Sequence, residues 1–103
     1  MIEKTPEPPY YAVIFTSLKK DDSKAYAEMA EKMEKLAKEQ PGYLGFESAR
    51  QEIGISVSYW EDLESIKNWK ENSEHLIAQE LGKKEWYEKY SVRIAKVERD
   101  YHF

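Results

Sequence analysis

The segment 68–79, NWKENSEHLIAQ, brings together the side chains of this chain that are best suited to chemistry. Trp69 offers a flat aromatic face on which a ring can stack. His75 follows six residues later, and a histidine can take up or return a proton near neutral pH. Asn68 adds a hydrogen-bond donor next to the tryptophan. Two readings follow: the segment lines a reaction chamber, or it is the packing side of a helix.

Plain structural roles compete with these chemical roles. Trp69 follows Ile66 by three residues on the apolar side of a helix, which is the usual position of a core tryptophan. His75 falls at the margin of that apolar face, so a surface or capping role fits its position as well as a role in a pocket does. Met33 either fills core space or lines a binding cavity. The sequence leaves both readings open.

The first elements of the chain follow from periodicity and capping signals. Residues 10–18, YYAVIFTSL, are rich in β-branched and aromatic side chains and have apolar residues at both odd and even positions, as in a strand covered on both sides. Residues 26–40 place apolar side chains on one helical arc, with N-cap candidates at 21–23 and a Pro-Gly stop at 41–42. We therefore predict a strand followed by an amphipathic helix.

The second half of the chain predicts two more strands, a helix and a final strand. Gly54 lies near the turn between the two middle strands. Asp62 can cap the second helix, which either runs unbroken or divides into two where Asn72 or Ser73 offers another cap. The expected strands are at residues 43–50, 55–60 and 91–101, with a turn at 51–54 between the first two. The expected helix is at residues 63–81, and a link at 83–90 leads into the last strand.

The order β-α-β-β-α-β predicts a ferredoxin-like α+β domain, with one antiparallel sheet and both helices on the same side of it. Residues 1–9 hold three prolines and are expected to form an extended arm, while residues 10–103 form a single domain. The other side of the sheet would be bare, although the first strand is apolar on both sides. The least costly cover is a second copy of the same sheet, so we predict a homodimer.

Composition excludes several classes of function. The 103 residues suffice for one core, and the net charge of −4 is spread along the chain, so neither nucleic acid nor a membrane surface is an expected partner. There is no cysteine, and two histidines 27 positions apart form no ligand pattern, so no metal site is predicted. No apolar run could span a membrane and the start lacks a signal-peptide core, so we expect a cytoplasmic protein.

Four short patterns occur in order along the chain: PGYLGFES, SYWEDLESIKNW, NSEH and WYEKY. Through them, residues 10–100 resemble the antibiotic-biosynthesis-monooxygenase-type domains of the dimeric α+β barrel superfamily. The resemblance implies a homodimer whose two sheets close into a barrel, with a cavity between the sheet and the helices of each subunit. Members of that family include cofactor-free oxygenases of polycyclic phenols and quinols, haem-degrading oxygenases and proteins of unknown activity, so the reaction stays open.

The haem-degrading members use a first-strand Asn, a helix Trp and a haem-ligating His ten residues after that Trp. Trp69 matches the Trp, but Gln79 stands in the place of the His, and Phe-Thr-Ser at 15–17 stands where the Asn belongs. Glutamine is a poor replacement for an imidazole ligand to haem iron. We therefore expect no cofactor, with haem disfavoured.

The resemblance agrees better with a cofactor-independent monooxygenase of a small aromatic molecule, of the phenol or quinol type. A deprotonated phenol reacts with dioxygen directly, so the protein has only to desolvate it, hold it beside oxygen and move protons. Trp69 and His75 are the expected catalytic residues. The expected substrate-binding residues are Phe15, Met33, Ser56, Ser58, Tyr59, Asn68 and Arg93.

Each substrate-binding residue has a separate expected role. Asn68 and the two serines supply hydrogen-bond donors, and Tyr59 or Arg93 binds a developing oxyanion. Alternation alone does not decide whether Ser56 and Ser58 face solvent, the dimer seam or the cavity. The main alternative function is a non-catalytic dimer that binds a small apolar ligand. A cavity filled by Trp69, Met33 and Phe15 would instead indicate a purely structural dimer.

Overall fold

The computed structural model describes residues 2–19, 24–80 and 87–103, with the side chains of 24–26 and 77–80 left out. The elements in these parts follow the predicted order β-α-β-β-α-β, which confirms the ferredoxin-like α+β fold. They are β1 (Tyr10–Lys19), α1 (Lys24–Lys38), β2 (Tyr43–Arg50), β3 (Gly54–Trp60), α2 (Leu63–Glu80) and β4 (Tyr87–Val97).

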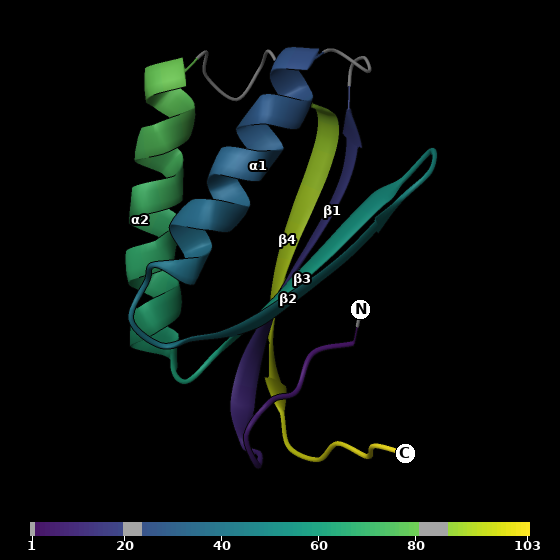
Figure 1. The fold of residues 1–103 in the computed structure, drawn as a ribbon, viewed down its shortest axis with the longest axis vertical. Coiled ribbons are helices and arrows are strands. Elements are labelled where there is room, and N and C mark those ends of the chain that lie inside the picture. The colour runs from purple at the N-terminus through teal and green to yellow at the C-terminus, as the bar shows by residue number, and fades with distance from the viewer. Residues whose placement is uncertain (1, 20–23, 81–86) are drawn as a thin grey trace.

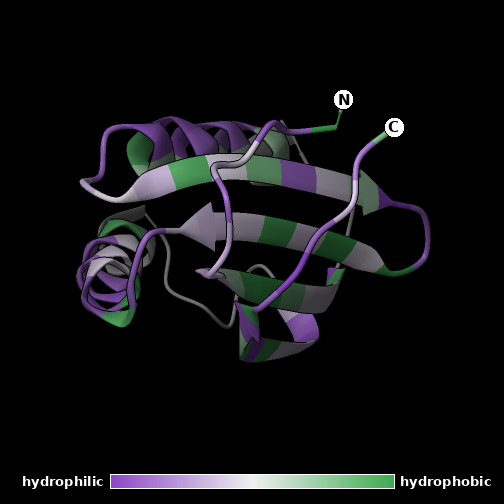
Figure 2. Ribbon diagram, turned by 90° about the horizontal axis from the view of Figure 1, so that it is seen from below, coloured by the Kyte–Doolittle hydropathy of each residue, from purple (hydrophilic) through white to green (hydrophobic). Residues whose placement is uncertain are grey.

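The four strands form one antiparallel sheet in the order β2-β3-β1-β4. β1 lies inside the sheet, between β3 and β4. Both helices lie on the same side of the sheet, where α1 contacts β2 and α2 contacts β3 (Figure 1). We call this side the helix side and the opposite side the open side. Figure 2 shows apolar residues recurring along the strands, as expected where the two sides of a strand meet different surroundings.

Two features at the ends of helices agree with the sequence-based predictions. Asp62 Oδ1 accepts a hydrogen bond of 2.8 Å from the backbone N–H of Ser65, so Asp62 caps α2 as predicted. Gly42 follows α1 in a left-handed conformation with φ of +85°, and a methyl group there would collide with the side chain of Ser65. Glycine at this position therefore lets the chain turn from α1 into β2.

The second helix does not divide. Asn72 Nδ2 donates to the carbonyl of Asn68 at 2.9 Å, and Ser73 Oγ donates to the carbonyl of Lys70 at 3.0 Å. Because both side chains bond to carbonyls of the preceding turn, neither starts a new helix, and α2 runs without a break from Leu63 to Glu80.

Several strand boundaries also differ from the prediction, and β4 ends at Val97, four residues before the predicted end at 101. β4 starts at Tyr87, inside the predicted link, because pairing with β1 continues as far as Lys19. Gly54 is the first residue of β3 and not part of the turn. The predicted caps at 21–23 and the start of the link at 83–86 lie outside the described residues.

The core lies between the helices and the end of β3. Trp60 is fully buried and packs against Ala37 of α1 and Ile66 of α2. Its indole Nε1 donates to Ser58 Oγ at 2.8 Å, so the buried polar group has a partner. Trp69 stacks on Trp60, with ring centroids 5.8 Å apart and planes 23° apart. One tryptophan therefore joins both helices to the sheet.

α1 is amphipathic, as its periodicity predicts. It buries Met29 and Ala37 and half-buries Met33, one turn apart on one side. Its Lys38 and Glu34 form a solvent-exposed pair at 3.9 Å, which contributes little to stability. Within the described residues, neither helix is long and apolar enough to cross a membrane.

Candidate functional site

The strand register sorts the helix-side residues of the sheet into four rows. Directly paired residues point to the same side of a sheet, and Trp60 in the core shows which side faces the helices. From the hairpin end to the core end, rows 1 to 4 are Arg50-Gly54-Ser17-Tyr90, Ser48-Ser56-Phe15-Val92, Phe46-Ser58-Val13-Ile94 and Tyr43-Trp60-Tyr11-Lys96.

Ser56 and Ser58 both face the helix side of the sheet. Ser58 is buried and holds the indole of Trp60, whereas Ser56 is half-buried beside Phe15. β3 thus presents a bulky tryptophan at the core end and only Gly54 and Ser56 toward the hairpin end. On β3, the large side chain therefore lies at the core end and the small ones lie toward the hairpin.

Three other predicted site residues lie on the helix side of the sheet. Trp69 of α2 is half-buried against Trp60, and Phe15 is half-buried in row 2. Met33 of α1 is half-buried one turn from buried Met29. Together with the two serines, these residues form the part of the predicted site that the fold brings to the helix side.

The remaining four predicted residues do not join this set. Tyr59 and Arg93 pair with Ala12 and Ile14 of β1, so both point to the open side. Asn68 and His75 are exposed on α2. Strand parity therefore removes Tyr59 and Arg93 from any oxyanion site beside Trp69. The side chain of Gln79, which replaces the haem-ligating histidine, lies outside the described residues.

Sequence reasoning missed an aromatic cluster at the β4 end of rows 1 and 2. Phe15 stacks with Tyr90, with centroids 5.6 Å apart and planes 29° apart, and meets Tyr87 edge-on at 5.2 Å. Further along β4, Val92 and Ile94 are 51% and 53% exposed although they face the helix side. The helices thus leave the β1–β4 half of this side open to solvent. Apolar residues at alternate positions of β4 were the signal that could have revealed it.

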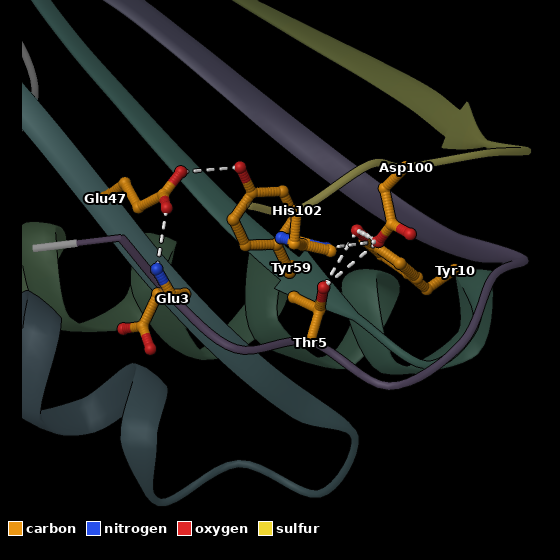
Figure 3. A network of polar contacts seen from close by, with 7 residues as sticks. All are labelled: Glu3, Thr5, Tyr10, Glu47, Tyr59, Asp100 and His102. Atoms are coloured by element: carbon orange, nitrogen blue, oxygen red, sulfur yellow. Dashed lines mark hydrogen bonds and ion pairs between the residues drawn. The ribbon is translucent and has the colours of Figure 1, made fainter.

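On the open side, hydrogen bonds join the N-terminal arm and the C-terminal tail to the sheet (Figure 3). The carboxylate of Glu47 accepts a bond of 2.8 Å from the backbone N–H of Glu3 and one of 2.7 Å from the hydroxyl of Tyr59. The hydroxyl of Tyr10 donates to Asp100 Oδ2 at 2.6 Å. Tyr10 and Tyr59 meet edge to face with centroids 5.8 Å apart, so the two sets of bonds are neighbours.

A hollow of about 310 Å³ lies among these groups. Thr5 and His102 contribute to its wall, since Thr5 Oγ1 donates to the Tyr10 hydroxyl at 2.9 Å and His102 Nε2 lies 3.3 Å from Asp100 Oδ2. The hollow is on the opposite side of the sheet from Trp69. It is therefore not the cavity that the sequence places beside that residue, and we assign its polar groups the role of fastening the two ends of the chain.

Burial and hydrogen bonding shift the pKa values of these groups. Burial raises the pKa of the Tyr59 phenol, and the bond to the Glu47 carboxylate raises it further. The pKa of the Glu47 carboxyl is lowered, first by the N–H of Glu3 and then by the Tyr59 hydroxyl. The Tyr10 hydroxyl is the main cause of the lowered pKa of Asp100. At neutral pH the phenols are therefore neutral donors and the carboxylates ionised acceptors.

This network predicts a loss of stability in acid. The folded-state pKa of Glu47 lies below its unfolded value, so its stabilising effect is present above the ordinary carboxyl pKa of about 4.3 and is lost as pH falls through the folded value. Tyr59→Phe removes one of the two bonds that lower this pKa. We expect the drop in free energy of unfolding between pH 7 and pH 3, measured by urea titration, to be smaller in Tyr59→Phe by about 0.5 kcal/mol after solvent screening.

Tyr101→Phe is the matched control, because Tyr101 is 76% exposed on the C-terminal tail. It removes a phenol hydroxyl without touching Glu47 and is expected to reproduce the acid-induced drop of the unchanged protein. An equal drop in Tyr59→Phe and Tyr101→Phe would show that the Tyr59–Glu47 bond has no part in the acid response.

Residues 9–81 match the family described as antibiotic biosynthesis monooxygenase. The chain belongs to this family. The match starts at the residue before β1 and reaches the end of α2, so it includes the sheet rows of β1, β2 and β3 and both helices.

Other proteins are similar to this chain in sequence or in fold. The uncharacterized protein YqjZ of Bacillus subtilis (strain 168) is 52% identical over 100 residues, which cover 95% of this chain and 88% of that protein. SnoaB, a cofactor-independent oxygenase from Streptomyces nogalater, has the same fold with a TM-score of 0.67 at 8% identity, over 92% of this chain and 97% of SnoaB. A conserved protein from Methanosarcina mazei Go1 gives a TM-score of 0.69 at 11% identity, over 89% and 94% of the two chains.

Neither histidine of the chain stands ten residues after Trp69, where the resemblance implies a haem ligand. His75 is exposed on α2, and His102 lies by the open-side network. No group of three or more His, Cys, Asp or Glu side chains in the described ranges could hold a metal ion.

Proposed function

We propose that this protein is a cofactor-independent monooxygenase of a small planar phenol or quinol, which binds on the helix side of the sheet. The observation that carries the proposal is the solvent-open surface of Phe15, Tyr90, Val92 and Ile94, facing the side where Trp69 stands. A flat apolar molecule gains free energy by covering such a surface. Family membership supplies the reaction type.

The reaction needs no electrons beyond those of the substrate. A ring carbon that carries two hydrogens in the keto tautomer loses a proton to give an electron-rich phenolate, which adds dioxygen. One oxygen atom becomes the carbonyl oxygen at that carbon, and the other leaves as water with the two hydrogens. The protein's tasks are to exclude water from the ring, to hold the ring still and to accept the proton.

The helix-side residues divide these tasks. Trp69 and Phe15 provide rings that stack on the substrate, and Ser56, with its half-buried hydroxyl, donates to the substrate oxygen. Ser58 already accepts a hydrogen bond from Trp60, so we assign it a structural role in the wall of the site. His75 is assigned the role of proton acceptor, because it follows Trp69 on α2 and is exposed, so that its proton can pass to solvent.

We further propose that the protein is a homodimer joined through the open side. Ile55 is 46% exposed there, next to half-buried Val57, and Ile14 of β1 pairs with Val57 on the same side. An apolar sheet side of this kind is usually covered by another layer. A second copy related by a two-fold axis covers it without blocking the helix side.

Oxygen uptake tests the activity. A panel of naphthols, dihydroxynaphthalenes and tricyclic phenols is incubated with the protein in an oxygen electrode, and the protein-free rate is subtracted. We expect uptake with at least one member, reduced about a hundredfold in His75→Ala and about tenfold in Trp69→Phe. His102→Ala, which removes the other histidine from the open side, should leave the rate unchanged. Equal rates in His75→Ala and the unchanged protein would remove His75 from the mechanism.

The alternative is a dimer that binds a small apolar ligand without turnover, and the same open surface favours it. Binding of a panel member without oxygen uptake would establish this alternative. Titration with haem separates the third class: we expect no Soret band at one equivalent per subunit, since Gln79 stands in the place where the resemblance implies a haem-ligating histidine. A stoichiometric Soret band that bleaches with a reductant would replace our proposal with haem oxygenation.

A further inference from the structure

We propose that Ser48, together with Ser56, makes the site selective for phenols or quinols that carry two oxygens on the same ring. The inference rests on the proposed function, because it takes the helix side of the sheet as the place where the substrate lies. Two observations carry it: a pair of hydroxyls in row 2 that no described group engages, and an apolar surface that continues the same row.

Row 2 holds two hydroxyls side by side. Ser48 of β2 pairs directly with Ser56 of β3, so their Cβ atoms lie about 5 Å apart on the helix side. Within the part of the chain that the structure describes, neither hydroxyl makes a hydrogen bond. The other two serines of rows 1 to 3 already accept bonds, Ser17 from a guanidinium and Ser58 from an indole. Row 2 therefore offers a ligand two adjacent donors.

The two hydroxyls can be reached from solvent. Ser48 is exposed and Ser56 is half-buried. Figure 1 shows the β2–β3 hairpin projecting past both helices, so the helices leave the hairpin end of these strands uncovered. In row 1, the guanidinium of Arg50 lies over Gly54 and donates to Ser17 Oγ. Arg50 thus bounds the pair of hydroxyls on the side of the turn.

The same row continues as an apolar surface. Ser56 pairs with Phe15 of β1, and Phe15 pairs with exposed Val92 of β4. Neighbouring strands are about 4.8 Å apart, so the whole row is roughly 14 Å long. One end carries hydroxyls, and the other carries side chains without polar atoms. A planar molecule of fused rings that lies along the row therefore places its oxygens over the serines and its bare ring over Phe15 and Val92.

The spacing of the serines favours two oxygens on one ring. Oxygens in meta positions are separated by about the distance between the paired side chains, so each oxygen can bond to one hydroxyl. An oxygen moved to the second ring lies instead over Phe15 or Val92, where it loses water without gaining a donor from row 2. A buried polar group left without a partner costs more free energy than an ordinary hydrogen bond contributes. The position of the second oxygen therefore decides the affinity.

The test uses two isomers, 1,3-dihydroxynaphthalene and 1,6-dihydroxynaphthalene, which share one hydroxyl position and differ in the ring that carries the other. Equilibrium dialysis without oxygen gives the Kd of each isomer. We expect the unchanged protein to bind the 1,3-isomer at least about tenfold more tightly. Ser48→Ala should lower this ratio to about two by weakening the 1,3-isomer alone. Ser48→Thr should keep the ratio, because it retains a hydroxyl at this position.

Ser91→Ala is the matched control, since Ser91 is a strand serine on the open side. It is expected to keep the ratio of the unchanged protein. A ratio near one in the unchanged protein, an equal ratio in Ser48→Ala, loss of the ratio in Ser91→Ala, or failure of both isomers to bind would each overturn the inference. If Ser48→Ala does not fold, Ser48→Val decides, because it has the shape of Ser48→Thr without the hydroxyl and must lower the ratio.

The two proposals fail in different ways. If the 1,3-isomer binds with the expected ratio but no phenol of the panel supports oxygen uptake, the serines orient a ligand that is not oxidised, and the monooxygenase proposal alone is lost. If uptake occurs and the ratio is near one, the activity stands and the substrate does not lie along row 2 with its oxygens over Ser48 and Ser56.

Discussion

Trp60→Ala is expected to lower the free energy of unfolding by about 3–5 kcal/mol, which is a large part of the total for a domain of ordinary stability. Trp60 is 0% exposed and packs with Ala37 of α1 and Ile66 of α2, so its removal leaves a cavity where both helices meet the sheet. Ser58 Oγ also loses the donor that it holds at 2.8 Å. Urea unfolding followed by circular dichroism measures the change without relying on tryptophan fluorescence.

Two variants separate the parts of this effect. Trp60→Phe keeps an aromatic ring but loses the indole N–H, so we expect a loss of about 1–2 kcal/mol. Trp69→Ala removes a half-buried ring from the same stack and should cost less than Trp60→Ala. If Trp60→Ala cost no more than Trp69→Ala, the core would have to be centred elsewhere than on Trp60.

The fold was predictable because the sequence signals that start and end its helices act on residues nearby in the chain. Asp62 caps the backbone of Ser65 three residues on, and Gly42 is needed because the turn after α1 has a positive φ. The alternative of a divided second helix was wrong. Asn72 and Ser73 are residue types that often cap helices, but here each bonds to a carbonyl of the preceding turn within the helix.

The candidate site was only partly predictable, because it depends on which side of the sheet each strand residue faces. Tyr59 and Ser58 are neighbours in sequence but point to opposite sides, and only the packing of Trp60 decides which side meets the helices. Arg93 shows the same limit on β4, where its parity puts it opposite Ile14 on the open side. Composition and spacing had made it as good a candidate as any helix-side residue.

The contacts of Arg50 with two other strands were not predictable for a different reason. At the end of a strand beside a turn, an arginine is typical of a solvated surface. Its position over Gly54 and its bond to Ser17 join three strands and are set by the register of two ladders. Contacts of this kind appear only once the strands are paired, whereas the tryptophan and histidine of α2 attract attention from sequence alone.

Ile55→Asp is expected to convert the dimer into a monomer at micromolar concentration, as measured by sedimentation equilibrium. Ile55 is 46% exposed on the open side of β3, so the change costs a single subunit little. In a dimer closed over that side, a carboxylate without a partner enters an apolar contact in both copies, and burying such a charge costs several kcal/mol. An association weakened by about 4 kcal/mol has a Kd nearly a thousand times higher.

Ile94→Asp is the matched control for this prediction. Ile94 is also an isoleucine of a strand, 53% exposed, but it faces the helix side. The dimer proposal requires the Ile94→Asp variant to stay dimeric while the Ile55→Asp variant does not. A monomeric unchanged protein, or a dimer that survives Ile55→Asp, would mean that the apolar open side is not an interface between two copies. Loss of the dimer in Ile94→Asp alone would place the two-fold contact over the helix side, and would then close the surface on which we place the substrate.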